Sequence, residues 1–133
     1  MLYAIKDAPV LEQVYQHKVY VYFNLHKKCW SVKALSGPNK GRVIIHCDRI
    51  VLRDPEFRVS QAGRRRVLRE RRKNVHAGVA GYIMEGDLPC GRWLPTTYNP
   101  YKYESFVDLA TEVPVQDAEL VYMYDKKVLR KEY

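Results

Sequence analysis

The sequence predicts an α+β fold, with a mostly antiparallel sheet or a small β-barrel and one short basic helix over about residues 60–73. Alternating apolar and polar residues support the strands, because a period of two is typical of a strand with one buried face. Good helix formers after Ser60, a suitable N-cap, support the helix. The length of 133 residues corresponds to roughly one domain, so we expect a single domain over 1–133.

The first half of the chain contains the clearest strand patterns. In residues 18–25, apolar side chains alternate with polar and tyrosine side chains, and the same pattern recurs after a short turn. A loop follows at 36–41, where two glycines, one proline and one asparagine occur in six residues. We expect the last strand of this half to end at Asp54–Pro55, because proline interrupts strand pairing. The predicted strands are residues 18–25, 29–34, 42–47 and 50–52.

The second half begins with the basic helix, which we expect to end near Asn74. A strand is predicted over 75–83, followed by a long connection over 85–104 that contains three prolines. A further strand is expected over 119–124. The predicted core residues are Val19, Val21, Phe23, Trp30, Val32, Ile44, Val67, Leu68, Leu120 and Val121.

Positive charge is concentrated in one segment. The formal net charge of the chain is +8, and residues 58–73 carry eight Lys/Arg against one Asp/Glu. Close stacking of like charges does not improve solubility, so this segment indicates an anionic partner. At about 100° per residue, Val67 and Leu68 would face the core, while Arg65, Arg69 and Arg72 would form an exposed stripe.

The helix also begins with arginines, although the helix dipole already presents partial positive charge there. Arginines and free N–H groups in a first turn favour phosphate binding. Arg64 and Arg71 fall at the edge of the buried arc, where their stems can pack. Eleven tyrosines add rings that could stack bases, above all on the face of residues 18–25 opposite the core. The predicted nucleic-acid-binding residues are Arg65, Arg66, Arg69, Arg72, Lys73, Tyr20, Tyr22, Tyr101 and Lys102.

Metal and catalytic motifs are not evident. The three cysteines are too few, and odd in number, for a disulfide framework, and we expect free thiols in a reducing compartment. We predict no metal and no cofactor, since four zinc ligands would have to converge from separate strands. A weak catalytic candidate is His76, which could act with Arg72 and Asp48 in a metal-independent ribonuclease.

Three stretches have a familiar pattern when taken together. They are Val21-Tyr-Phe-Asn-Leu-His-Lys-Lys28, Ala62-Gly-Arg-Arg-Arg-Val-Leu-Arg-Glu-Arg-Arg-Lys-Asn-Val-His-Ala-Gly78 and Tyr98-Asn-Pro-Tyr-Lys-Tyr-Glu-Ser-Phe-Val107. The chain resembles a group of small bacteriophage and prophage proteins of unknown function. The resemblance implies a phage or prophage setting and no particular activity.

These observations favour a non-enzymatic phage accessory protein that binds nucleic acid, DNA or RNA, through its arginine-rich helix. The alternative is an inhibitor that docks on an acidic surface of a host defence, transcription or replication protein. A ribonuclease or a structural virion component are further alternatives. We expect a cytoplasmic protein without a membrane partner, because no apolar run approaches the roughly 20 residues of a membrane helix. A homo-oligomer is also compatible with the sequence.

Overall fold

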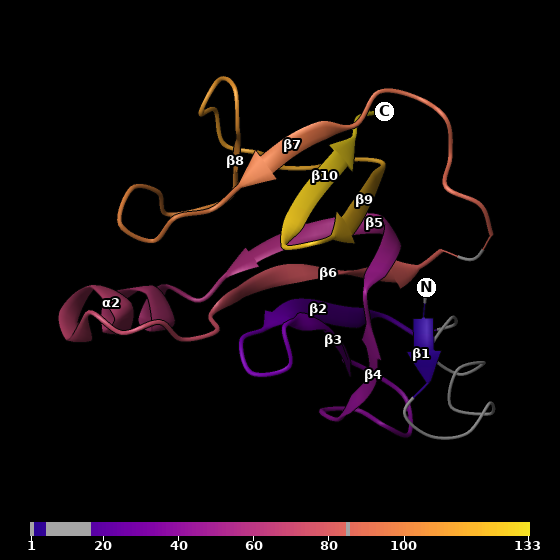
Figure 1. Ribbon diagram of the computed structural model, residues 1–133, viewed down its shortest axis with the longest axis horizontal. Helices are drawn as coiled ribbons and strands as arrows, with labels where there is room; N and C mark the ends of the chain where they lie inside the picture. The colour runs from indigo at the N-terminus through magenta and orange to yellow at the C-terminus, as the bar shows by residue number, and fades with distance from the viewer. Residues whose placement is uncertain (1, 5–16, 85) are drawn as a thin grey trace.

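The computed structural model describes residues 2–4, 17–84 and 86–133 (Figure 1). Its strands are β1 (Leu2–Ala4), β2 (Val19–Asn24), β3 (Cys29–Ala34), β4 (Val43–Cys47), β5 (Arg49–Val59), β6 (Ala77–Ile83), β7 (Leu94–Thr97), β8 (Val107–Asp108), β9 (Leu120–Tyr124) and β10 (Lys127–Lys131). Helix α2 (Gln61–Glu70) lies between β5 and β6 in the chain. The strands form one sheet in the order β1-β4-β3-β2-β6-β5-β9-β10-β7-β8.

The predicted α+β class and the predicted small barrel are both wrong. In the described part of the chain, α2 is the one helix and has 10 residues, so the fold is mainly β. The sheet is open, because β1 and β8 lie at its two ends and are not paired with each other among the described strands. The error arose partly in the proline-rich second half, where β7 and β8 add strands that the sequence pattern did not reveal.

Strand β5 corrects another expectation. It continues for 11 residues through Asp54 and Pro55, where the sequence predicted a break. The register against β6 shifts between Arg53 and Glu56, and Asp54 has a φ of 51°. Such a bulge tolerates proline, because the residues in it need not donate backbone N–H hydrogen bonds to the neighbouring strand. One half of β5 pairs with β9 and most of the strand pairs with β6, so β5 joins the two halves of the sheet.

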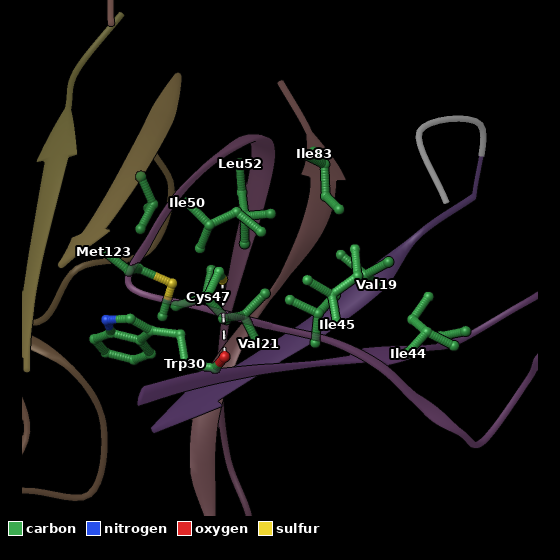
Figure 2. Close-up of a cluster of buried hydrophobic side chains, with 14 residues drawn as sticks. Val19, Val21, Trp30, Ile44, Ile45, Cys47, Ile50, Leu52, Ile83 and Met123 are labelled. Atoms are coloured by element: carbon green, nitrogen blue, oxygen red, sulfur yellow. Dashed lines mark hydrogen bonds between the residues drawn. The ribbon is translucent and has the colours of Figure 1, made fainter. Parts of the chain in front are cut away.

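The apolar core lies on one face of the curved sheet (Figure 2). Eight of the ten predicted core residues are buried, while Phe23 and Leu68 are half-buried, so the core prediction is largely confirmed. The ring of Trp30 meets that of Phe23 edge-on at 5.2 Å between centroids. Because the core residues of β2 and β3 point inward, the alternate residues of these strands form the outer face.

The cysteines are free thiols in three different environments. Cys47 belongs to the core, and its S–H donates to the Trp30 carbonyl oxygen at 3.7 Å. Burial raises the pKa of the Cys47 thiol to about 12, so this thiol is un-ionised at neutral pH. Cys29 is half-buried and Cys90 is exposed.

Candidate nucleic-acid interface

Helix α2 is fixed at its start by an N-cap and by a close contact with His76, the residue that precedes β6. The Ser60 hydroxyl oxygen accepts a hydrogen bond from the Gly63 N–H at 3.1 Å. The Ser60 N–H donates to the His76 carbonyl oxygen at 2.8 Å. A Cβ on Gly63 would lie 2.4 Å from the Cβ of His76, so only glycine allows this approach. The helix therefore begins where the sequence predicted, with its first turn against His76.

The helix ends earlier than the sequence predicted. Its last residue is Glu70, and Arg71 adopts a left-handed backbone with φ 57° while its N–H donates to the Val67 carbonyl oxygen. Arg72 and Lys73 consequently lie beyond the helix. The predicted stripe spaced at i, i+4 and i+7 keeps only Arg65 and Arg69 on the helix. Left-handed ends normally carry glycine, and the absence of glycine here hid the end from sequence analysis.

We expect the Arg71→Gly variant to be more stable than Arg71→Ala by about 1 kcal/mol, because a Cβ is disfavoured at a positive φ. Both variants remove the arginine side chain, so each serves as the control for the other. Urea unfolding of the two variants measures the difference. An Ala variant as stable as the Gly variant would show that the helix continues past residue 71, as the sequence predicted.

Two arginines at the edges of α2 tie it to the loop 98–104. The Arg64 Nε donates to the carbonyl oxygens of Pro100 and Tyr103, at 3.0 and 2.9 Å. The Arg71 guanidinium lies 5.8 Å from the centre of the Tyr101 ring. These contacts make the helix and the loop one surface, at the left end of the sheet in Figure 1. Tyr101 and Lys102 are exposed on this loop, beside the helix.

The cations of α2 differ in how far they are neutralised. Arg66 pairs with Glu70, with 2.6 Å between Nε and Oε2, and this hydrogen bond holds the pKa of Glu70 below its usual range. Arg65 and Arg69 are exposed. In the part of the chain that the structure describes, neither has an acidic partner within 4 Å. Arg65 and Arg69 are therefore better placed to bind an anion than Arg66.

A second group of predicted residues meets in a cavity of about 660 Å³, which we name the tyrosine groove. Tyr20 and Tyr22 project into it from the outer face of β2, and their ring centroids are 6.0 Å apart with an angle of 32° between the planes. Lys73, which follows α2, lines the same groove. The structure thus brings residues from two distant parts of the sequence together, and it places Tyr101 and Lys102 outside the groove.

Tyr20 is held firmly in this groove. A Cβ on Gly78 would lie 2.7 Å from the Tyr20 Cζ, so the ring packs directly on the glycine backbone. Burial raises the pKa of the Tyr20 hydroxyl, and the positive charge of Arg58 partly opposes this effect. The hydroxyl is therefore neutral at physiological pH and would not repel a phosphate.

The sequence analysis missed the groove residue Lys33. Lys33 lies opposite Tyr20 in the register of β2 and β3. Its outward position follows from the alternation with Val32 and Ala34, so the facing strand could have revealed it. The sequence also did not predict that the Arg53 guanidinium lies over the Tyr82 ring, with 4.9 Å between the Arg53 Cζ and the ring centroid.

His76 has partners that suit a structural role. Its Nδ1 lies 3.1 Å from both the carbonyl oxygen and the Oδ1 of Asn74. The Asn74 carbonyl oxygen and Oδ1 are both acceptors, so Nδ1 donates to them, while Nε2 is hydrogen-bonded with the Tyr98 hydroxyl at 2.7 Å. The catalytic group predicted from the sequence, His76 with Arg72 and Asp48, is not brought together. Asp48 precedes the start of β5, whereas His76 lies beyond the other end of that strand.

The described residues offer neither a metal-binding cluster nor a membrane-spanning helix. Within residues 2–4, 17–84 and 86–133, no three His, Cys, Asp or Glu side chains are grouped so that they could hold a metal ion. Within the same ranges, no helix has the length and apolar character needed to span a membrane.

Comparison with known proteins places the sequence among phage proteins. Residues 13–131 match the model of a protein family described as "Mycobacterium phage L5 gene 82 protein". The "Gene 82 protein" of Mycobacterium phage L5 is 40% identical over 117 residues, which cover 84% of this chain and 93% of that protein. No solved structure shows a significant match. The resemblance predicted from three sequence stretches is therefore confirmed.

Proposed function

Because the chain belongs to the family of the Mycobacterium phage L5 gene 82 protein, we propose that it is a phage accessory protein. From its basic and aromatic surface, and not from the family, we propose that it binds nucleic acid in the host cytoplasm. In this proposal it acts without catalysing a reaction. Arg65 and Arg69 on α2 contact phosphates, and Arg72 and Lys73 extend the basic surface towards the tyrosine groove. Tyr101 and Lys102 border the same surface from the loop 98–104.

One observation carries the proposal: Lys73 directly follows the arginine-rich segment and lines the same groove as Tyr20 and Tyr22. Basic side chains that lead into a surface with accessible rings are the combination that nucleic-acid-binding proteins use for backbone and bases, and Tyr20 and Tyr22 are half-buried in such a groove. A merely solvated helix does not require tyrosines beside its end. Arg65 and Arg69, which lack acidic partners among the described residues, remain available for phosphate.

Binding is tested with short fluorescent oligonucleotides of mixed sequence, single-stranded and duplex, by anisotropy at low salt. We expect wild-type protein to bind and Arg65→Glu/Arg69→Glu to lose most of the affinity, because phosphate contacts supply most non-specific binding. Arg92→Glu, which makes the same charge reversal at one arginine away from α2, is the control. Arg92 is exposed and belongs to the connection between β6 and β7. Residues 86–93 of this connection run along the side of the molecule opposite α2 (Figure 1).

A failure of this test would favour the alternative partner. If the purified protein binds neither oligonucleotide at low salt, or if the double Glu variant binds as well as wild type, the nucleic-acid proposal is wrong. The helix would then be a candidate docking surface for an acidic host protein. Affinity capture from host lysate, with and without nuclease, separates the two outcomes, because a protein partner survives nuclease treatment.

A further inference from the structure

We infer that the tyrosine groove takes unpaired bases, so that the nucleic acid is single-stranded where it crosses the sheet. A base stacks on the Tyr22 ring, and Lys33 and Lys73 contact the neighbouring phosphates. This inference rests on the proposed function and adds the form of nucleic acid that the groove accepts.

The lining of the groove suits bases and phosphates together. Three of its apolar side chains are unusually exposed: Leu25 at 43%, Val43 at 39% and Val75 at 46%. Lys33 and Lys73 supply positive charge, and none of the described lining residues is acidic. Apolar and aromatic surface covers base faces, which are apolar, while the two lysines lie within the same cavity to neutralise the backbone.

Stacking on a ring favours unpaired bases. Tyr20 and Tyr22 lie side by side on one strand, with their ring centroids 6.0 Å apart and 32° between the ring planes. Neighbouring bases in a duplex are only about 3.4 Å apart and cover each other's faces. A base that stacks on the Tyr22 ring must turn an uncovered face towards it. A single strand offers such a face, whereas a duplex would have to unstack first.

The two tyrosines have different roles in the groove. Tyr20 packs on the Gly78 backbone, so it forms a rigid floor. Tyr22 lies opposite Ser31 in the register of β2 and β3, so its neighbour on the facing strand is small. Ser31 is itself held by hydrogen bonds with Asn24 and His46, at 3.1 and 3.0 Å. We therefore assign the stacking contact to Tyr22.

The test measures anisotropy of a labelled single strand and of the duplex with the same sequence, for wild type, Tyr22→Leu and Tyr22→Phe. We expect wild type to prefer the single strand. Tyr22→Leu should weaken single-strand binding about 10-fold, because stacking on an aromatic ring is lost. Tyr22→Phe keeps the ring and should bind like wild type. Thermal unfolding of both variants confirms that each is folded.

Competition with an abasic strand gives an independent measurement. This strand carries the same sugar-phosphate backbone without bases, so it should compete poorly if bases contact the groove. DNA and RNA versions of the labelled strand are compared, and tight binding of either supports the inference.

The inference and the proposed function fail in different ways. If Tyr22→Leu binds like wild type, or duplex and abasic strands bind as well as the single strand, the inference is wrong. The proposed function stands in that case, provided that Arg65→Glu/Arg69→Glu still loses affinity. If no nucleic acid binds at low salt, both are wrong.

Discussion

Replacing Trp30 with alanine is expected to lower the free energy of unfolding by about 3–5 kcal/mol. Trp30 is only 4% exposed and packs among the core residues of β2, β4 and β9 (Figure 2). Removing its ring creates a cavity that the surrounding strands cannot close, because their positions are fixed by pairing on both sides. Urea unfolding monitored by far-ultraviolet circular dichroism measures the loss.

Two further variants make this prediction specific. Leu88→Ala is the surface control, since Leu88 is 45% exposed, and it should change stability by less than about 0.5 kcal/mol. Trp30→Phe should cost clearly less than Trp30→Ala. It retains an aromatic ring and removes an Nε1–H that is buried without a hydrogen-bond partner among the described residues. A Trp30→Ala variant as stable as Leu88→Ala would contradict the buried position of the indole.

A threefold rise in salt is expected to weaken single-strand binding about 20-fold, if four cations each neutralise one phosphate. The four cations are those of the proposed function, Arg65, Arg69, Arg72 and Lys73; a phosphate on Lys33 in the tyrosine groove would add a fifth contact and make the loss about 50-fold. The physical cause is the release of counterions from the nucleic acid, which becomes less favourable as salt rises. For a duplex that makes the same four contacts, the slope of log affinity against log salt should be steeper, near −3.6.

Single substitutions test the count of contacts. Arg69→Ala should reduce the single-strand slope by about 0.7 and leave sequence preference unchanged, because phosphate contacts carry no sequence information. Arg92→Ala should leave the slope unaltered. Stability should hardly change in either variant, since both side chains are exposed. A slope near zero for wild type would exclude binding through phosphates and would favour a protein partner.

Local pattern was enough to predict several parts of the fold. The alternation in residues 18–25 and 29–34 identified β2 and β3 and most of the core, because side chains on a strand must alternate between faces. Ser60 marked the start of α2 correctly, since a capping hydroxyl is a local requirement. The resemblance to phage proteins was also visible in the sequence alone.

Other features depended on interactions that local pattern does not contain. The bulge at Pro55 keeps β5 continuous only because β6 shifts its register there. The end of α2 depends on a left-handed arginine, which propensity disfavours. The tyrosine groove requires both the β2–β3 register and the path of residues 73–75, so the sequence named Tyr20, Tyr22 and Lys73 without showing that they meet.

The pairing of β2 with β6 has a consequence for how the molecule forms. Val19 lies opposite Gly81, so this ladder closes only after the intervening β3, β4, β5 and α2 have been synthesised. Pairings between residues so distant in sequence slow folding, and sheets dominated by them fold in milliseconds to seconds. β2 and β3 are neighbours in the chain and can pair during translation, with the tyrosines already on one face. Lys73 and Val75 reach that face only once β6 joins β2, so the groove forms later than the β2–β3 hairpin that carries its tyrosines.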